Sequence, residues 1–296
     1  MIGRTGGDRS AKRSDPLAPS KAMRRFIYIA LIVVGSFYVL PFVLAVVTSF
    51  KSLPDFAAHA SSLGFDRSQG SPTLDGLRGL DSDRILFARW TFNSVVVTVC
   101  VVGGRVMLSA LAGYSLARIK FPGYRLVFGV ILAVMMVPAI VLAIPRFILL
   151  KELGLINTYA GLILPLMFDA FGIFLMKQFM EQIPIELEEA AAIDGASRFR
   201  TFTKVILPVA RPAVITLAIL STVGAWNEFL HPLIAVNRNE LRTLPVGLAQ
   251  LRGQFGSSTP WHTIMMASVL MTIPMAIIYF VFQRHFKEGM AGAVKG

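Results

Sequence analysis

The chain has 296 residues, of which 55% are hydrophobic and only 16% are charged. Soluble domains are usually about a quarter charged, so this composition excludes an ordinary soluble domain and indicates a protein embedded in lipid. The net charge of +12 does not indicate nucleic-acid binding, because the cations stand between apolar runs, as membrane orientation requires. The single cysteine, Cys100, excludes an internal disulfide and a cysteine-based metal cluster.

The N-terminal part divides into a basic tail and an apolar run. Residues 1–25 mix Arg and Lys with Gly, Ser and Pro and lack apolar periodicity, which predicts a disordered cytoplasmic tail. Residues 26–50 carry no charge, and this run exceeds both the ~20 residues that cross a bilayer and the ~7–15 residues of a signal-peptide core. We therefore predict a retained transmembrane helix and a transmembrane domain over 26–296.

Five further apolar stretches of nearly the same length follow. They cover residues 93–117, 127–145, 157–176, 213–230 and 262–282. A single chain segment satisfies its backbone in lipid only as a helix, so each stretch predicts a membrane-spanning helix. The polar residues 51–89 between the first and second spans predict an external loop. The expected fold class is an all-α integral membrane protein with six transmembrane helices.

The distribution of Lys and Arg predicts the orientation. Of the 29 Lys and Arg residues, 18 fall in the tail, in two loops and in the C-terminal segment 284–296, which lie on one side. The other side holds 10, and Arg105 lies within a span. Cationic segments stay in the cytoplasm, so both termini and the charged loop 183–212 are predicted to be cytoplasmic.

The loop 183–212 reads IPIELEEAAAIDGASRFRTFTKVILPVARP and has helical signals of its own. Pro184 can open a helix whose first turns are acidic, and a run of three alanines favours helix. Gly195 suits a left-handed C-terminal cap, and Ser197 can cap a second helix over 199–207 that Pro208 stops or bends. The sequence therefore predicts two short helices joined by a glycine turn. Composition alone also allows an ordinary solvated hairpin.

Motif spacing within this loop resembles a known family. Glu189-Ala190-Ala191, then Gly195 six residues after the glutamate, then Leu207-Pro208, resembles the EAA loop of ABC importer permeases. Val205 stands where that family has isoleucine. The stretches AGYSLARIKFPG (112–123), MMVP (135–138), LGLINTYAGLILP (153–165), AWNEFL (225–230) and GMAGAVKG (289–296) are similar to the second permease of maltose-type sugar importers.

The resemblance implies a type I ABC importer transmembrane-domain fold in a bacterial cytoplasmic membrane and a coupling helix that docks on a separate ATPase subunit. It implies these coupling residues: Glu188, Glu189, Ala190, Ala191, Asp194, Gly195, Ala196, Phe199, Leu207 and Pro208. It implies that the C-terminal tail contacts the ATPase through Gly292, Ala293, Val294, Lys295 and Gly296. The implied partners are a homologous second permease, two ATPase subunits, an external solute-binding protein and membrane lipid.

The chain itself lacks the G-x-x-x-x-G-K-[ST] phosphate loop, so ATP must act through a partner. We expect this chain to bind no cofactor or metal, with ATP and Mg²⁺ on the ATPase. The predicted spans hold no nucleophile–base constellation, so a catalytic role is not favoured. The alternative to a sugar-importing permease is a non-transporting membrane anchor or a subunit of a membrane enzyme complex.

Three ionisable residues lie at predicted membrane depth: Arg105, Asp169 and Glu228. Charges are costly there, so each is a candidate for the substrate pathway. One hypothesis is that Arg105 and Asp169 pair between helices, which would reduce the cost of burying either residue. A purely structural latch is an equal alternative.

For the solute itself we expect Trp226, Asn227 and Glu228 first, with Asp169 and Arg105 as further candidates. Sugar hydroxyls suit amide and carboxylate hydrogen bonds, and a sugar ring face suits stacking on Trp. The alternative is that Trp226 is an interfacial residue and that Asn227-Glu228 is a break in the span. Asn93 and Asn157 are expected to cap helices. The sequence does not identify the sugar.

Overall fold

The computed structural model describes residues 20–80, 85–119, 121–254 and 260–293, apart from the side chains of 252–254 and 283–293. All regular secondary structure in these residues is helical. Four stretches are long and apolar enough to cross a membrane: α1 (Lys21–Ser49), α4 (Phe87–Arg118), α7 (Tyr159–Met167) together with α8 (Ala170–Glu181), and α15 (Trp261–Ala293) over Trp261–Phe282. A fifth candidate is a bent pair in which Arg198–Val209 meets α12 (Arg211–Trp226) at 77°.

The stretch predicted as the third span forms a shorter helix than expected. Helix α5 (Tyr124–Met135) has 12 residues. Beyond it, Met136 and Val137 donate to carbonyls only three residues back, in a tightened last turn. Pro138 disfavours helical backbone at the residue before it. The next helix, α6 (Ala143–Glu152), begins five residues after Pro138. Length and hydropathy among the described residues therefore support four or five spans, and the six predicted are not confirmed.

The start of α1 differs from the predicted boundary at residue 26. The Ser20 hydroxyl accepts a hydrogen bond from the Met23 N–H at 3.2 Å, so Ser20 caps the helix and Lys21 is its first residue. The last five residues of the expected tail are thus helical. Residues 1–19 of that tail lie outside the described part of the chain.

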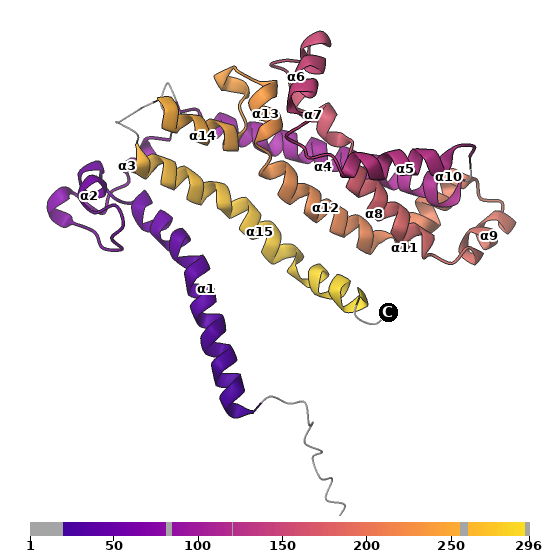
Figure 1. Cartoon of the computed structure of the whole chain (residues 1–296), viewed down its shortest axis with the longest axis horizontal. Coiled ribbons are helices and arrows are strands. Elements are labelled where there is room, and N and C mark those ends of the chain that lie inside the picture. The colour runs from indigo at the N-terminus through magenta and orange to yellow at the C-terminus, as the bar shows by residue number, and fades with distance from the viewer. Residues whose placement is uncertain (1–19, 81–84, 120, 255–259, 294–296) are drawn as a thin grey trace, which may run out of the picture.

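Helix α4 is the central element of the bundle. It packs against α7, α8, α12 and α14, while α15 packs against α1 and α12. Figure 1 shows α9 (Glu186–Ile193) and α10 (Arg198–Thr201) at one end of the long axis and α2 (Leu53–Ala58) and α3 (Asp75–Arg78) at the other. We call these the α9 end and the α2 end. Helix α4 has 32 residues, about 48 Å at the usual rise per residue.

Two large groups of buried apolar residues lie along this axis. One, here called the α9-end cluster, joins α4, α8, α12 and the π-helical turn η2 (Phe202–Ile206); it includes Tyr114, Met176, Met180, Phe202 and Ile206. Another joins α4, α12, α14 (Leu244–Gln254) and α15, and includes Trp90, Trp226 and Leu251. A third group joins α4, α6, α7, α12 and α13 (Leu230–Ala235) and includes Val97, Leu150 and Leu162, so the helices of the described chain are held together by three apolar groups.

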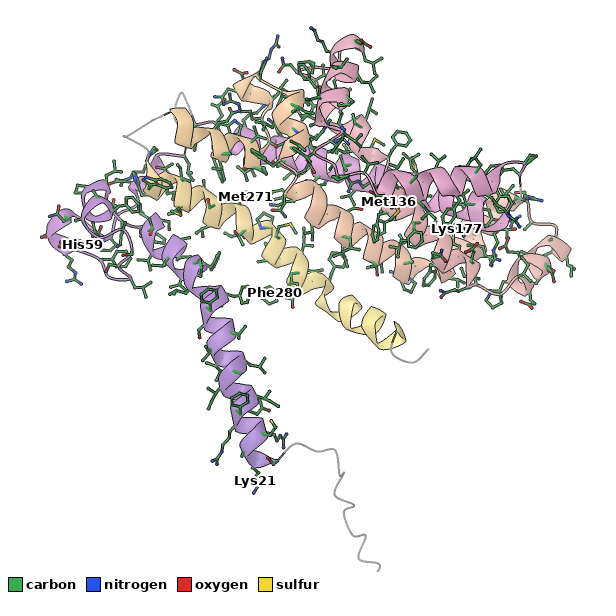
Figure 2. All side chains as sticks on the ribbon, in the orientation of Figure 1. Lys21, His59, Met136, Lys177, Met271 and Phe280 are labelled. Carbon is green, nitrogen blue, oxygen red and sulfur yellow. The ribbon has the colours of Figure 1, made fainter. Side chains whose placement is uncertain are left out.

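The loop predicted over 51–89 folds around a buried lysine at the α2 end. The Lys51 ammonium donates to the carbonyls of His59 at 2.6 Å and Ser62 at 2.8 Å. The loop contains α2, the short turn η1 (Arg67–Gln69) and α3, and α4 begins before residue 89. The remaining short elements, α13 (Leu230–Ala235) and η3 (Asn239–Leu241), precede α14. In Figure 2 the His59 side chain projects from this end, and Lys177 lies near the other.

Candidate functional site

The first candidate site is a helical knob at the α9 end, formed by α9, α10, η2 and α11 (Leu207–Val209). Helix α9 has Glu186, Glu188 and Glu189 in its first turn, where carboxylates stabilise the positive end of a helix. Gly195 follows the helix with φ +75°, a left-handed conformation that glycine adopts without strain. The Ser197 hydroxyl then caps α10 by accepting from the Arg200 N–H at 3.3 Å.

The second helix of the knob continues past the position where Pro208 was predicted to stop it. Proline at 208 lacks the N–H that would donate to the Lys204 carbonyl, and its ring would clash there. The chain widens into the π-helical turn Phe202–Ile206 just before it and remains helical to Val209. Only at Ala210 does the backbone bend, by 77°, into α12. The predicted bend is therefore present, but it lies at Ala210 and not at Pro208.

The knob has an outward face rich in apolar side chains. Ile193 is 87% exposed and Phe199 is 69% exposed, and Leu187 is also exposed. Glu189, Ala190, Asp194 and Gly195 are exposed as well. Large exposed apolar groups rimmed by polar residues mark surfaces that bind a partner. The predicted coupling residues therefore fall into two groups. Glu189, Ala190, Asp194, Gly195 and Phe199 form the group that faces away from the protein.

Glu188 faces the opposite way, toward the end of α4. Its Oε1 lies 2.7 Å from the Arg118 Nε, and the two side chains are only 14% and 12% exposed. The Tyr114 hydroxyl donates to the other oxygen, Oε2, at 3.1 Å. Arg118 also donates to the Ile183 carbonyl, at the start of the loop. Glu188 and Glu189 were both predicted as coupling residues, but Glu188 contacts α4 and Glu189 is exposed.

A cavity of about 310 Å³ opens beside this ion pair. Its wall contains both charged partners and the outward-facing Glu189, together with Arg198 of the second helix. Ala191 is buried against the knob interior, and Ala196 is half-buried. The small side chains of the alanine run therefore let α9 pack closely against α10 and the π-helical turn η2.

Sequence reasoning missed Arg118 and Tyr114 as functional candidates, although both lie in the quoted stretch 112–123. Their spacing of four residues places both on one face of α4. A cation and a hydroxyl at the end of a span, opposite a carboxylate-rich loop, were the available signal. Their common partner is more than 60 residues away in sequence, so local patterns could not identify it.

The second candidate site is the break between α7 and α8. Pro165 lies inside α7 and has no N–H for the Gly161 carbonyl. The buried His231 ring supplies a donor instead, with its Nε2 at 2.8 Å from that carbonyl oxygen. Since a carbonyl oxygen can only accept, His231 must carry its proton on Nε2. The backbone group that proline leaves unpaired is therefore satisfied by α13.

Arg105 and Asp169 meet this same break separately. The Arg105 Nε donates to the Leu166 carbonyl at 2.6 Å, a group that the end of α7 leaves free. The Asp169 Oδ2 accepts from the Gly172 N–H at 2.9 Å and caps α8. Among the described ion pairs none joins the two residues, so the pairing hypothesis is wrong for this structure. Arg105 and Asp169 each form a hydrogen bond with a backbone group that a helix end leaves unpaired.

The third candidate site is the end of α12. The Asn227 amide donates to the Val223 carbonyl at 2.9 Å, and Glu228 Oε1 accepts from the His231 N–H at 3.0 Å. Asn227 is exposed and Glu228 half-buried, so both retain polar capacity for a solute. The predicted break in this span is present: α12 ends at Trp226 and α13 starts at Leu230.

Trp226 differs from the prediction of a stacking surface. Its side chain is 4% exposed, packs in the group of α14 and α15, and its Nε1 donates to the Met271 carbonyl at 3.2 Å. The ring offers no open face to a solute in this conformation. Sequence proximity to Asn227 and Glu228 suggested a common site, but the helix end turns the indole into the core.

Asn93 and Asn157, expected as helix caps, connect the spans to the segment between α13 and α14. The Asn93 amide donates to the carbonyls of Glu240 and Arg242, each at 2.8 Å. Asn157 has φ +60°, and its side-chain oxygen accepts from the N–H groups of Asn237 and Arg238. Both asparagines therefore hold the segment between α13 and α14 in place.

The predicted ATPase-contacting tail falls at the limit of the described chain. Helix α15 extends to Ala293, so the backbone of Gly292 and Ala293 continues the helix. Val294, Lys295 and Gly296 lie outside the described residues. The contact itself stays a prediction.

The chain resembles known proteins over most of its length. Residues 106–292 match the family described as "Binding-protein-dependent transport system inner membrane component". The permease protein AraQ of an arabinooligosaccharide transport system from Halalkalibacterium halodurans is 33% identical, over 92% of this chain and 94% of its own. The permease protein MalG of a trehalose/maltose transport system from Thermococcus litoralis is 34% identical, over 92% of this chain and 97% of its own.

A solved structure has the same fold. It is that of a bacterial ABC transporter involved in the import of the acidic polysaccharide alginate, with a TM-score of 0.77 and 24% sequence identity. The match covers 91% of this chain and 99% of the other. The fold is therefore that of an ABC transporter permease.

Proposed function

We propose, from the premise that this chain belongs to the family of binding-protein-dependent transport system inner membrane components, that it carries a sugar or sugar-like solute into the cell. The chain is a transmembrane permease subunit of an ABC importer and is not itself an enzyme. The relatives whose transport systems are named for arabinooligosaccharides and for trehalose and maltose support the solute class.

The observation that carries the proposal is the exposed knob. A subunit without a phosphate loop needs a surface through which a separate ATPase can act on its spans. The outward face of α9 and α10 offers Glu189, Ile193 and Phe199 at one end of the molecule. We assign to this face the docking of the ATPase, with the turn at Gly195 setting the angle between the helices.

The remaining coupling residues have supporting roles in this proposal. Ala191 and Ala196 keep the knob compact, Ala190 belongs to the docking face, and Asp194 ends α9. Leu207 and Pro208 join the knob to the bend before α12. ATP and Mg²⁺ act on the ATPase chain, and a contact of residues 292–296 with that subunit is part of the proposal.

The proposed topology has six crossings with both termini in the cytoplasm of a bacterial cell. Residues 124–145 make the third crossing, because α5 alone spans only about 18 Å against ~30 Å of hydrocarbon. The positive-inside tendency then places the knob in the cytoplasm, where ATP is present. The folded part of the 51–89 loop lies outside, on the side from which a solute-binding protein delivers its ligand.

The proposed solute pathway follows the two breaks. Asp169 and Arg105 stand at the α7–α8 break, and Asn227 and Glu228 at the end of α12. Their carboxylate, guanidinium and amide groups match the hydrogen-bonding demand of sugar hydroxyls. Irregular backbone at membrane depth occurs where it lines a cavity or is buried in protein, which agrees with a pathway there. Trp226 supports the pathway from the core.

The proposed complex pairs this chain with a homologous second permease, two ATPase subunits and an external binding protein. Apolar side chains along most of α1 are exposed, including Phe37 and Tyr38. Figure 1 shows α1 leaving the rest of the bundle. Lipid and the second permease together are the expected cover of this helix.

The test is ATP-dependent uptake by proteoliposomes that contain the whole complex and its binding protein. Radiolabelled maltose, trehalose and an arabinotriose serve as separate probes. We expect accumulation of at least one sugar only when ATP and the binding protein are both present. Glu189→Lys should abolish that uptake, with Glu186→Lys on the same helix as its control. Failure of every sugar would overturn the solute class, and full uptake by Glu189→Lys would overturn the docking assignment.

A further inference from the structure

We propose that the Arg118–Glu188 ion pair is the joint through which displacement of α9 is passed to α4. The inference rests on the proposed function, because it assumes that a partner moves the knob. Arg118 and Glu188 are positioning residues in this account. They contact neither solute nor nucleotide, and they determine whether movement of the knob reaches the spans.

The geometry joins the two elements at more than one point. Arg118 contacts the first turn of α9 through the Glu188 Oε1 at 2.7 Å and the start of the loop through the Ile183 carbonyl. Tyr114, one turn earlier on α4, donates to the Glu188 Oε2 at 3.1 Å. Both carboxylate oxygens of Glu188 are therefore held by one face of α4. The Arg118 Nε–Glu188 Oε1 contact is an ion pair without hydrogen-bond geometry, whereas the Tyr114 hydroxyl donates a charge-assisted hydrogen bond to the same carboxylate. The hydrogen bond fixes the orientation of the Glu188 carboxylate more strictly than apolar packing does, and the ion pair adds attraction between the helices.

Apolar contact alone would not fix that orientation. The α9-end cluster holds the second knob helix to α4 and α8 through Phe202 and Ile206, and Tyr114 belongs to it. Apolar attraction is non-directional, so this contact permits sliding and rotation. Helix α9 has a single buried residue, Ala191, to contribute to packing. Its position relative to α4 depends chiefly on the ion pair.

The surroundings of the pair make both partners necessary. Each side chain is less than 15% exposed, so removal of one partner leaves a poorly solvated charge. Arg198 and Glu189 also line the adjoining cavity, one of each sign. They add no net charge that would replace a missing partner.

The other end of α4 shows where such a displacement would arrive. The Trp90 Nε1 donates to the Asn239 carbonyl at 2.9 Å, and Asn93 donates to the carbonyls of Glu240 and Arg242. The Ser94 hydroxyl accepts from the Leu244 N–H at 2.7 Å. One uninterrupted helix thus has polar attachments to the knob at its C-terminus and to the α13–α14 segment at its N-terminus.

The experiment is a charge exchange in the complete importer. Arg118→Glu, Glu188→Arg and the double exchange are reconstituted with all partner subunits, and solute uptake and ATP hydrolysis are both measured. We expect each single variant to hydrolyse ATP but to move on the order of tenfold less solute per ATP, a typical size for coupling between sites. The double exchange should restore most of that ratio.

A matched control is the Lys177–Glu181 pair, which has an N–O distance of 2.7 Å but lies within α8. Its single charge reversals should leave the transport-to-ATP ratio unchanged. Glu188→Gln keeps a hydrogen-bonding group without the charge and serves if the reversed variants do not assemble. If Glu188→Gln and the single reversals transport as much solute per ATP as the unaltered complex, the proposal that this ion pair passes on the displacement is wrong.

Other outcomes separate the joint from the proposed function. Loss of assembly in every Arg118 and Glu188 variant, without recovery in the double exchange, would make the pair structural only and overturn the joint. If the unaltered complex transports sugar in those same experiments, the proposed function stands. Absence of ATP-dependent uptake in the unaltered complex would overturn both.

Discussion

The knob at the α9 end and the mid-bundle break between α7 and α8 both interrupt apolar helices, yet they are stabilised differently. The knob is oriented by a contact between two charged side chains, Arg118 and Glu188. The break is stabilised by side chains that pair with backbone groups: Arg105 with the Leu166 carbonyl, and Asp169 with the Gly172 N–H. Charge complementarity sets the first, and backbone hydrogen bonding sets the second.

This difference has a consequence for movement. A side-chain pair at the end of a long helix can pass on a displacement of a neighbouring segment, because the two partners belong to different helices. The Leu166 carbonyl accepts a hydrogen bond from Arg105 but carries no charge. A displacement there would therefore not act on a second charged side chain. The knob is therefore suited to transmission, and the break is suited to keep polar groups at a fixed place in an apolar bundle.

The largest expected effect comes from the turn of the knob. In Gly195→Val a β-branched residue must adopt φ +75°, at a cost of about 1–2 kcal/mol or more. We expect ATP-dependent uptake to fall at least about tenfold, since the angle of the docking face changes. Uptake in proteoliposomes is the measurement.

Gly154→Val is the matched control for that variant. Gly154 also has positive φ, +67°, and a Cβ there would meet nothing within 4 Å, as at Gly195. Both variants should lower the unfolding temperature of the complex to a similar extent, and only Gly195→Val should stop uptake. Equal loss of uptake in the two would show that strain, rather than the knob, is responsible.

A charge exchange at the break should give the next largest effect. Arg105→Asp leaves the Leu166 carbonyl unpaired, at about 1–3 kcal/mol. Asp169→Arg removes the cap of α8, at about 1 kcal/mol. The double variant should lose the sum of the two within about 0.5 kcal/mol, because the residues do not pair. Unfolding of the purified complex measures this, and a double variant more stable than either single one would show that the charges do pair.

The Asp169 cap alone predicts a smaller effect. Asp169→Ala should destabilise α8 by about 1 kcal/mol, whereas Asp169→Asn keeps a capping oxygen and should remain near wild type. Thr158→Ala is the control, because Thr158 caps α7 with the same geometry, accepting from the Gly161 N–H at 2.9 Å. If Asp169→Asn retained stability but lost uptake, the carboxylate would act on the solute as well as on the helix.

The smallest effect concerns acid stability of the loop at the α2 end. A hydrogen bond from Ser71 is the main cause that holds the pKa of Asp55 below its ordinary value of 3.8, against a smaller opposing effect of burial. A lowered pKa in the folded state means that the stabilisation is complete above pH 3.8 and is lost as the pH falls through the lower value.

Hydrogen exchange of residues 51–80 as a function of pH checks this point. We expect constant protection from neutral pH down to about 4 and a decline below it. Asp55→Asn should reduce the pH dependence and leave the part due to Asp66, whose pKa is also lowered, chiefly by a side-chain hydrogen bond from Ser68. Asp75→Asn, at an exposed carboxylate, should leave the pH dependence unchanged. A loop whose protection fell between pH 7 and 5 would contradict the assignment to Asp55.

The knob could be predicted well from the sequence because its signals are local. Acidic residues and alanines in a short window predict α9, Gly195 predicts the turn, and Ser197 predicts the cap of the next helix. The bend after Pro208 was misplaced by two residues, since the π-helical turn accommodates the proline. Chain distance was no obstacle to any of these features.

Features that depend on distant partners could not be predicted in the same way. The partner of Glu188 is 70 residues away, and the burial of Trp226 depends on α14 and α15. Hydropathy also did not indicate that α5 ends at Met135, because a count of apolar residues ignores Pro138. The His231–Gly161 contact follows from Pro165 only once the two segments are known to meet.

The most direct test of the transmission account is a distance measurement between α9 and α4. Spin labels at Ile193→Cys and Met107→Cys, both exposed positions, in a Cys100→Ser background report this distance in the reconstituted complex. We predict one narrow distribution that stays the same without nucleotide and with a non-hydrolysable ATP analogue, and that broadens in Arg118→Met. A shift between the two nucleotide states with Arg118 intact would contradict the claim that the knob and α4 move together.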